Sequence, residues 1–468
     1  MDERFEDHLR HPRRRGFEPA GAHDGVAGGA ACGDLVRIAL RVEGERVAEA
    51  GFEASGCGAI VAAASAVVEL VEGAPILDAA RLAPSDVAAE LGGLSPGKLH
   101  AADLAADALH VALGKAVASE ATATSRGRVL VAMSGGVDSA VAALLCARSG
   151  AEVVAVTLEL WRDADNDAER SCCSASAVRA ARGVAHRLGL PHLTLDLREP
   201  FRAGVVEPYL ADHAAGLTPN PCIRCNGHVR LDAMLELADR LGADALATGH
   251  YARVGDDGLL RPAVDEAKDQ TYMLAGLRRE SLARMRFPLG ELRKPEVRAL
   301  AAEAGISVAH KPDSQDLCFL AGTGRAAFLA RHGGIRDRPG DIVDRGGRSL
   351  GRHRGHHHFT VGQRRGLGVG GGTGDPLYVL ATDPRANTVT VGPREALAQR
   401  RVAVRGVRLH RDEAAVARVK LRYRSRAVPC RLAGGEVELL EPFDAAAPGQ
   451  TAVFFADDDA VVGVATIV

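Results

Sequence analysis

The sequence contains no long apolar run. Its longest apolar stretches, such as AIVAAASAVVELV from Ala59, are too short and too rich in alanine to span a bilayer, so no membrane is expected as a partner. The chain opens with charged residues and shows no apolar stretch behind them, so a secretory leader is not predicted. Nine cysteines lie scattered and form no evenly spaced disulfide framework, which favours free thiols in a reducing, cytoplasmic compartment.

An excess of charge of either sign is also missing, because the formal net charge is −2. Binding to nucleic acid would therefore depend on local basic patches and not on the field of the whole molecule. No period of about 20 to 50 residues recurs, which argues against a solenoid. With 47% hydrophobic and 25% charged residues the composition is that of a globular protein. At roughly 150 residues per domain, the length of 468 residues predicts about three domains.

The hydrophobic pattern changes character along the chain. Residues 1–118 combine a period-two segment with two helical patterns, as in a small α+β domain, and a small polar linker is expected at 119–125. Strands that alternate with helices over 126–335 predict a parallel sheet covered by helices. Short β-rich runs and glycine turns then predict a central β-rich domain at 336–398 and a C-terminal β-barrel at 399–468.

A glycine-rich turn, SGGVDS from Ser134, separates an apolar strand from a helix. The backbone N–H groups of such a turn and of the helix N-terminus can receive phosphate oxygens. The turn lacks the lysine of a G-x-x-x-x-G-K-[ST] loop, and Asp138 would instead suit a metal ion that bridges pyrophosphate. An ordinary tight turn is the alternative. The motif resembles the PP-loop of ATP pyrophosphatases, which adenylate a carbonyl oxygen and release pyrophosphate.

Further motifs make the resemblance more specific. They are ATGHYAR from Ala247, KDQTY from Lys268, FPLG from Phe287, DSQDLCF from Asp313 and TVGQRRGL from Thr360. Together they resemble the tRNA-specific 2-thiouridylases over most of the chain behind the linker. The resemblance implies an α/β fold with a PP-loop parallel-sheet domain of the adenine nucleotide alpha hydrolase type, followed by β-rich and β-barrel domains. It also implies a tRNA-uridine 2-sulfurtransferase that uses ATP to thiolate the wobble uridine and releases AMP and pyrophosphate.

The same resemblance assigns residues to the nucleotide and to the RNA. ATP with Mg²⁺ would be held by Ala132, Met133, Ser134, Gly135, Gly136, Val137, Asp138, Ser139, Leu158 and Gly249. The tRNA, of the lysine, glutamate or glutamine type, would be contacted by Asn220, Pro221, Cys222, His250, Lys268, Asp269, Gln270, Arg422, Tyr423 and Gln450. The target uridine would have to leave its base stack and enter a pocket near Asn220.

Three cysteines are candidates for the sulfur chemistry. Cys222 and Cys225 lie three residues apart in a proline-containing turn, and Cys318 lies far away in sequence. An activated uridine needs a sulfur nucleophile, which a persulfide can deliver while a second thiol resolves the intermediate as a disulfide. The resemblance implies that Cys318 carries the persulfide and that Cys225 is its catalytic partner. A cysteine desulfurase or another sulfur donor would supply the sulfur. An iron-sulfur cluster on the three cysteines is the alternative.

The first domain carries a separate set of possible ligands. Cys32, Asp34, Cys57 and His100 resemble the ligand positions of U-type iron-sulfur cluster scaffolds. Such a set can hold a cluster, or zinc, weakly enough to pass it on. Where that family has its third cysteine, this chain has Ala101. The domain could therefore hold a metal, dock a sulfur donor or be a structural remnant.

Two groups of basic residues predict contacts with RNA phosphates. They are His353, Arg354, His356, His357, His358, Arg364 and Arg365 in the first group and Arg400, Arg401, Arg405, Arg408 and Arg411 in the second. The triple histidine could bind a metal, but the interleaved arginines would repel a cation, so RNA binding or a solvated surface is favoured.

Two other functions would use part of this sequence. An argininosuccinate-type or an amide-forming ligase could use the glycine loop, but it would not need Cys225 and Cys318. An iron-sulfur carrier that only binds RNA would leave the phosphate loop idle.

Overall fold

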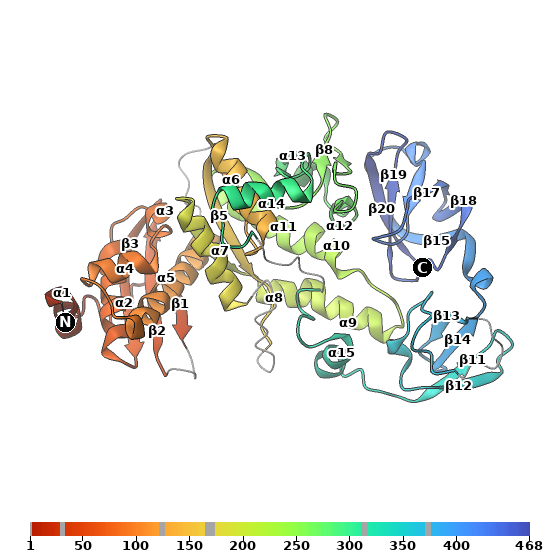
Figure 1. The fold of residues 1–468 in the computed structure, drawn as a ribbon, viewed down its shortest axis with the longest axis horizontal. Helices are drawn as coiled ribbons and strands as arrows, with labels where there is room; N and C mark the ends of the chain where they lie inside the picture. Colours follow the sequence, from red (N-terminus) through yellow and green to blue (C-terminus); the bar gives the residue numbers. More distant parts are fainter. Residues whose placement is uncertain (1, 29–32, 121–126, 164–173, 310–316, 370–375) are drawn as a thin grey trace. The chain divides into compact units, whose positions relative to one another are not determined.

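The computed structural model describes residues 2–28, 33–120, 127–163, 174–309, 317–369 and 376–468. They form two compact units, coloured along the chain in Figure 1. The first unit comprises Met1–Arg198, Ala233–His250 and Arg284–Cys318, and the second comprises Glu199–Asp232, Tyr251–Ala283 and Phe319–Val468. Within the described ranges no helix has both the length and the apolar character that crossing a bilayer requires.

The chain begins with a three-stranded antiparallel sheet of order β1-β2-β3. Its strands are β1 (His23–Gly28), β2 (Leu35–Glu43) and β3 (Arg46–Ser55). The period-two segment therefore forms the hairpin that its pattern predicts. The helices around this sheet are α1 (Glu3–Arg10), α2 (Gly58–Val71), α4 (Pro84–Glu90) and α5 (Leu99–Ser119). A Cβ at Gly25 would lie 2.0 Å from the Ala108 carbonyl oxygen, so α5 packs on β1 at backbone distance.

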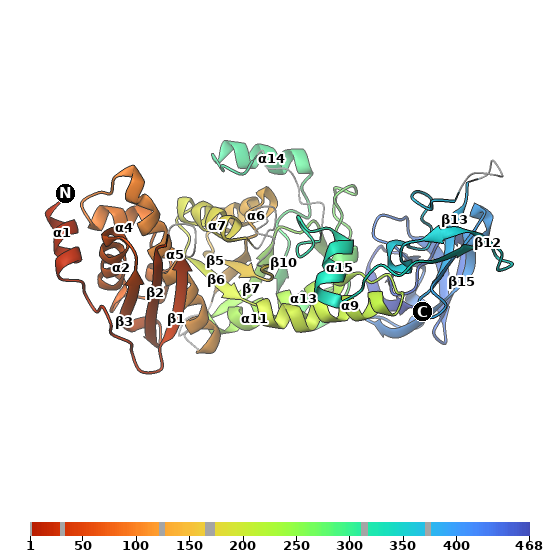
Figure 2. The same cartoon turned by 90° about the horizontal axis from the view of Figure 1, so that it is seen from below.

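A five-stranded parallel sheet of order β10-β7-β4-β5-β6 confirms the predicted α/β fold. Its strands are β4 (Arg128–Ala132), β5 (Glu152–Glu159), β6 (His192–Asp196), β7 (Ala243–Thr248) and β10 (Met285–Arg286). The helices α6 (Val137–Arg148), α7 (Ala175–Arg187) and α14 (Lys294–Glu303) belong to the same unit, and Figure 2 shows them beside the sheet. Strand order reverses between β4 and β7, so the carboxyl ends of these strands form a switch point, where open α/β sheets bind ligands.

Helix α5 also packs on the edge strand β6 of this parallel sheet. A Cβ at Gly114 would lie 1.8 Å from the Thr194 carbonyl oxygen, so this approach requires a glycine. Asp107 of α5 accepts ion pairs from Arg179 and from the buried Arg182 of α7. The antiparallel domain and the parallel sheet therefore share one packed unit. Helix α5 includes Ser119, one residue beyond the predicted domain end, and residues 121–125 of the predicted linker lie outside the described residues.

The second unit contains two β structures. A mixed sheet of order β12-β11-β14-β13 consists of β11 (Gly340–Val343), β12 (Ser349–His353), β13 (Tyr378–Asp383) and β14 (Thr388–Gly392). A closed barrel of order β15-β18-β17-β16-β19-β20 consists of β15 (Ala398–Leu409), β16 (Arg418–Lys420), β17 (Val428–Ala433), β18 (Glu436–Asp444), β19 (Thr451–Phe455) and β20 (Val461–Ile467). Inward-facing apolar residues of the barrel strands form its core, as the alternating pattern predicts.

Helical segments of the second unit include α9 (Glu207–Ala214), α10 (Pro221–Cys225), α12 (Thr271–Leu274) and α15 (Arg325–Gly333).

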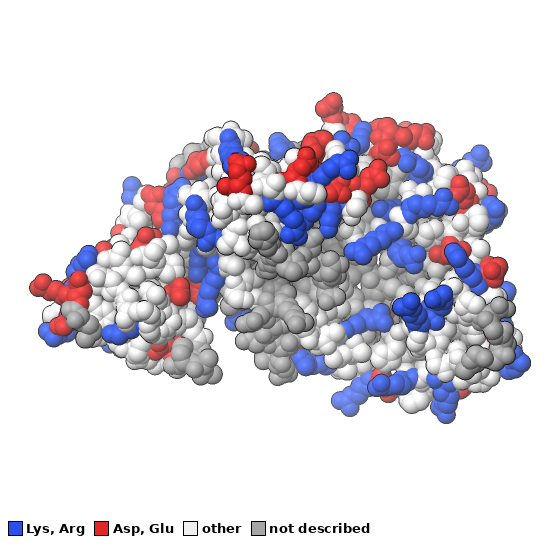
Figure 3. Space-filling model, viewed as in Figure 1, with Lys and Arg blue, Asp and Glu red and all other residues white. Residues whose placement is uncertain are grey.

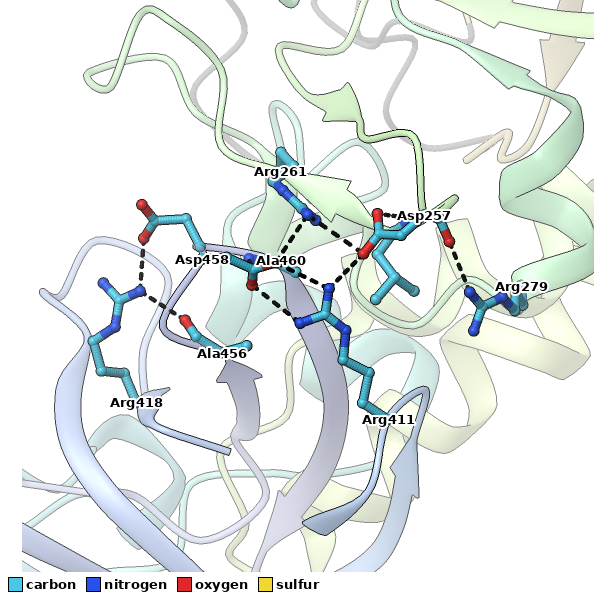
Figure 4. Close-up of polar contacts among 10 residues, drawn as sticks. Asp257, Arg261, Arg279, Arg411, Arg418, Ala456, Asp458 and Ala460 are labelled. Carbon is cyan, nitrogen blue, oxygen red and sulfur yellow. Dashed lines mark hydrogen bonds and ion pairs between the residues drawn. The ribbon is translucent and has the colours of Figure 1, made fainter. Parts of the chain in front are cut away.

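A small hairpin of β8 (Arg253–Val254) and β9 (Leu260–Arg261) is tied to the barrel by ion pairs (Figure 4). Asp257 in the hairpin turn accepts from Arg411 Nη2 at 2.5 Å, and Arg411 also donates to Asp458 between β19 and β20. These charges hold the pKa of Asp458 down at about 2, chiefly through its hydrogen bonds with Arg411.

Candidate functional site

The glycine loop follows β4 at the switch point of the parallel sheet. Gly135 has φ +69°, and a Cβ there would lie 2.9 Å from the Ala177 carbonyl oxygen, so the turn requires glycine. Ser139 ties the loop together, because its Oγ accepts from the Ser134 N–H at 3.1 Å and donates to the Gly136 carbonyl at 3.1 Å. No side chain caps the N-terminus of α6 at Gly136. Its N–H groups can therefore serve an anion.

The other residues expected at the nucleotide lie around this loop. A Cβ at Gly249 would lie 2.6 Å from the Ser139 nitrogen, so the chain after β7 passes directly against the loop. Ala132 pairs with Thr248 at the ends of β4 and β7. On the other side, Met133 N–H donates to the Val156 carbonyl of β5 at 2.8 Å, and Leu158 lies two residues further along that strand. The structure thus brings the predicted ATP residues together.

Lys294, which the motifs did not single out, forms an ion pair with Asp138 of the loop. Its Nζ lies 2.8 Å from each carboxylate oxygen, and the residue is only 8% exposed. It is the first residue of α14, where the helix dipole disfavours a cation. Burying a lysine at such a position is unfavourable unless a counter-charge lies near, and Asp138 supplies one beside the phosphate-type loop. The sequence signal is weak: a lysine followed by proline shortly after the FPLG motif.

A second cluster lies in the antiparallel domain. Ligand atoms of Asp34, Cys57 and His100 all lie within 4.8 Å of one another. Asp34 is buried, and its Oδ1 accepts from the Cys57 N–H at 2.7 Å. Its Oδ2 pairs with His100 Nε2 at 2.9 Å and lies 3.3 Å from the Cys57 sulfur. Burial opposes ionisation of Asp34, but these hydrogen bonds outweigh it and lower the pKa of the carboxyl.

This cluster lines a cavity of about 480 Å³ together with Phe5 and Lys98. Thiol, carboxylate and imidazole donors fit a zinc ion or an iron-sulfur cluster. Cys32 lies outside the described residues, and the fully buried Ala101 offers no donor atom. The structure therefore assembles three donors of the predicted set of four.

The thiols expected to handle sulfur belong to both units. In the second unit Asn220 caps α10, its side chain accepting from the Cys222 N–H at 3.1 Å. Cys225 ends that helix and is buried, whereas Cys222 is partly exposed. A π-helical turn, Asn226–Arg230, follows directly, a feature common at functional sites. Cys318 is partly exposed in the first unit, whereas the preceding residues 310–316 lie outside the described residues.

Two other cysteines behave as packing residues, as their apolar surroundings predict. Burial raises the pKa of Cys146 to about 11 and that of Cys430 to about 12. Such thiols are almost entirely protonated at neutral pH and are poor nucleophiles. Cys172 and Cys173 lie outside the described residues.

The helical part of the second unit and its barrel enclose a cavity of about 770 Å³. Asn220, Pro221 and Arg224 line one side, and Arg405 and Arg408 of β15 line the other. Figure 3 shows several lysine and arginine side chains gathered on the face of this unit that is turned to the viewer. A basic cavity beside the expected RNA residues suits a nucleotide with its phosphates.

Other expected RNA residues surround the entry to α10. Gln450 of the barrel donates to the Thr218 carbonyl at 2.6 Å, just before Asn220. Tyr423 packs against the buried Tyr272, with the ring centres 5.9 Å apart and the ring planes tilted by 41°. The carboxylate of Asp269 accepts from the Thr271 hydroxyl at 2.7 Å.

The neighbours of Asp269 have local roles as well. Gln270 accepts from the Tyr251 N–H at 3.0 Å, so this loop is held in place by its own polar side chains. Lys268 and Arg422 are the remaining expected RNA residues of the second unit, and they lie in the same region. Burial raises the pKa of Tyr423 and of Tyr272, and the charges of Lys268 and Arg422, respectively, oppose that rise. His250 belongs to the first unit, where its Nδ1 lies 2.8 Å from Thr248 Oγ1.

Comparison with known proteins places this geometry in a family. A bifunctional protein NifU/MnmA from Rubrobacter xylanophilus is 48% identical over 97% of this chain and 96% of the relative. The tRNA-specific 2-thiouridylase MnmA of Zymomonas mobilis is 44% identical over 72% of this chain and 92% of the relative. The chain belongs to the tRNA-specific 2-thiouridylase family, in the form fused to a NifU-like domain. The resemblance seen in the motifs is thereby confirmed.

Family models divide the same chain into four parts. The NifU-like N-terminal domain matches residues 2–122, and the HUP domain of tRNA methyl transferase matches 127–322. The PRC-barrel domain of tRNA methyl transferase matches 326–393, and an aminomethyltransferase beta-barrel domain matches 400–467. In this 2-thiouridylase the HUP model thus covers the glycine loop, and the last model covers the closed barrel.

Three histidines of the first basic group, His353, His356 and His357, have lowered pKa values. Burial lowers the pKa values of His353 and His356, and burial together with neighbouring histidines lowers that of His357 to about 4. Burial thus opposes positive charge on these three imidazoles. RNA-phosphate binding by the whole group stays a prediction, and burial disfavours a contribution of charge from these three histidines, because a run of basic residues in the sequence does not reveal which of them the fold desolvates.

Some arginines of the two groups are in ion pairs, and others line the large cavity. Arg354 pairs with Asp337, and Arg411 is engaged by Asp257 and Asp458 (Figure 4). Arg405 and Arg408 line the large cavity instead. In the second basic group of this 2-thiouridylase, Arg411 therefore joins the hairpin to the barrel. Arg405 and Arg408 lie at the cavity and are the arginines best placed for phosphate.

Proposed function

We propose that this protein is an ATP-dependent tRNA 2-thiouridylase of the cytoplasm. The observation that carries the proposal is the glycine loop at the switch point, with Asp138 and Lys294 paired beside it. Loop N–H groups and the N-terminus of α6 bind phosphate oxygens of ATP. Asp138 supplies a hard oxygen ligand suited to Mg²⁺, and Lys294, once released from Asp138, offsets charge on the pyrophosphate that leaves.

The reaction then takes three steps. The O2 atom of the wobble uridine attacks the α-phosphorus of ATP, so that a C–O–P bond forms and pyrophosphate leaves. The terminal sulfur of a persulfide on Cys318 attacks C2, and AMP leaves with the oxygen. The Cys225 thiolate then attacks the inner sulfur of Cys318, which breaks the S–S bond, leaves the sulfur on C2 and forms a disulfide that a cellular thiol must reduce. A cysteine desulfurase is the expected source of the persulfide.

The experiment that tests this function measures pyrophosphate release and 2-thiouridine formation together, with lysine-, glutamate- or glutamine-type tRNA. Release that depends on tRNA and is matched by thiolation supports the proposal. Pyrophosphate without thiolation would indicate an amide-forming ligase, and neither product would indicate a carrier that only binds RNA. Anaerobic purification with iron and sulfide analysis tests the alternative of a cluster on Cys222, Cys225 and Cys318.

The basic cavity gives a prediction for RNA binding. Replacing Arg405 and Arg408 together by alanine should weaken tRNA binding and reduce the slope of log K against log salt by about 1 for each phosphate that the variant no longer neutralises. Arg400 and Arg401 lie on the same strand but do not line the cavity, so the pair Arg400→Ala with Arg401→Ala is the matched control. Equal affinities and equal slopes for the two double variants would contradict a role of the cavity in RNA binding.

The NifU-like domain is proposed to hold a cluster or zinc, or to pass sulfur to the catalytic unit. Delivery within one chain raises the effective concentration of a donor, so the domain should matter most when the donor is scarce. We expect Cys57→Ser with His100→Gln to lower the thiolation rate several-fold at limiting donor and not with excess desulfurase and cysteine. Point variants are preferable to deletion, because α5 also packs on β6.

The matched control for this variant is Cys146→Ser, which removes a thiol that burial keeps protonated. It should leave the donor titration unchanged. If the Cys57 and His100 variant also follows the wild-type titration throughout, the domain takes no part in delivery and is a structural remnant.

A further inference from the structure

The mixed β-sheet of the second unit brings an acidic residue next to two adjacent histidines. Strands β11 and β12 are antiparallel, with Gly340 paired to His353 at one end. Asp337 lies three residues before that pair, and the turn His356–His358 begins three residues after it. The register of two strands therefore places the carboxylate beside the histidines, although they are about twenty positions apart in sequence.

The ligand atoms converge on one carboxylate oxygen. His358 Nε2 lies 2.6 Å from Asp337 Oδ1, and His357 Nε2 lies 3.6 Å from the same atom. The two imidazole rings lie 4.2 Å apart, centre to centre. The His357 side chain is 3% exposed and is seated against Gly355, where a Cβ would lie 2.6 Å from the ring. The glycine thus leaves the space that the ring occupies.

We propose that Asp337, His357 and His358 form a binding site for a divalent transition metal of the zinc class. Two imidazoles and a carboxylate are a set that zinc accepts, and three protein ligands leave one position for water. At metal–ligand distances near 2.0 to 2.1 Å, tetrahedral ligand atoms lie about 3.3 Å apart. The His357 distance already suits this spacing, and the hydrogen bond of His358 would open by a small side-chain rotation.

Arg354 was the reason to discount a metal from the sequence, and the structure changes that argument. Its guanidinium contacts the other carboxylate oxygen, with Nη2 2.6 Å from Oδ2, and so does not occupy the space between Oδ1 and the imidazoles. A hydrogen-bonded partner behind a ligating carboxylate orients it, as is usual around metal ions. Arg325 donates to the His358 carbonyl at 3.3 Å and fixes the turn from the other side.

The test is zinc stoichiometry of the full-length protein by equilibrium dialysis. His357→Gln with His358→Gln should bind one zinc fewer per chain than wild type. His356→Gln, a change in the same turn outside the ligand set, is the matched control and should bind as wild type. Cobalt substitution separates this site from cysteine sites, because the spectrum that the double variant loses should lack sulfur-to-metal charge transfer.

A further variant guards against misfolding. Asp337→Asn keeps the size of the side chain and an acceptor for His358 but loses the charge, so zinc affinity at this site should fall on the order of tenfold or more. Melting curves of the metal-free proteins verify their folding. Equal zinc counts and affinities in wild type and all variants would overturn the proposal and leave the cluster as an ion-pair network only.

Discussion

Replacing Asp138 by alanine should reduce tRNA-dependent pyrophosphate release by on the order of a hundredfold to a thousandfold, the effect of removing one group that stabilises the charge of a transition state. Binding of tRNA should hardly change, because the residues of the basic cavity belong to the second unit. The measurement is single-turnover pyrophosphate release, with tRNA affinity determined in parallel. Release at the wild-type rate would contradict the role of the glycine loop.

The ion pair with Lys294 complicates a single substitution and also supplies its control. Removing Asp138 leaves Lys294 buried and uncompensated, and loss of one partner of a buried pair destabilises a protein by about 3 to 5 kcal/mol. Lys294→Met combined with Asp138→Asn leaves no charge behind and should recover most of that stability. If the pair served only the fold, the double variant would recover activity as well. We expect it to melt near wild type and yet to release no pyrophosphate above background.

How far the sequence predicts this site depends on the distance between its parts along the chain. The strand, the glycine turn and the helix around Asp138 are local, and their spacing alone predicted the loop. Gly249 was found through a motif, and the structure shows its physical reason, which is contact with the loop backbone. Lys294 comes from a helix far along the chain, so only the packing of α14 on α6 reveals it.

The two basic groups show what the sequence does not predict. Composition cannot distinguish a solvated arginine from one in an ion-pair network, or a charged histidine from a buried one. Arg408 and Arg411 are three positions apart on the same segment, yet one lines a cavity and the other joins the hairpin to the barrel. Burial of His357 likewise follows from the pairing register of β11 and β12, which the amino-acid sequence alone does not reveal.

The three candidate cysteines predict different outcomes for the two proposed sulfur chemistries. In the persulfide route, Cys318→Ser should abolish 2-thiouridine while pyrophosphate release persists through one turnover, because adenylation precedes sulfur transfer. Cys225→Ser should also release pyrophosphate without 2-thiouridine, or it should stop with uridine C2 still joined to Cys318 through two sulfur atoms. Cys430→Ser, which removes a thiol with a pKa of about 12, serves as the control and should thiolate normally.

Cys222 decides between the routes. A persulfide route needs one carrier and one resolving thiol, so Cys222→Ser should keep substantial activity, whereas a cluster with three cysteine ligands should lose its iron and its activity with any one of them. The Asn220 side chain caps the helix at the Cys222 backbone and not at its thiol, so the fold should tolerate the serine. We therefore expect Cys222→Ser to thiolate and Cys318→Ser not to. A wild-type yield of 2-thiouridine from Cys318→Ser would exclude the persulfide role, and parallel loss of iron and activity in all three variants would establish the cluster instead.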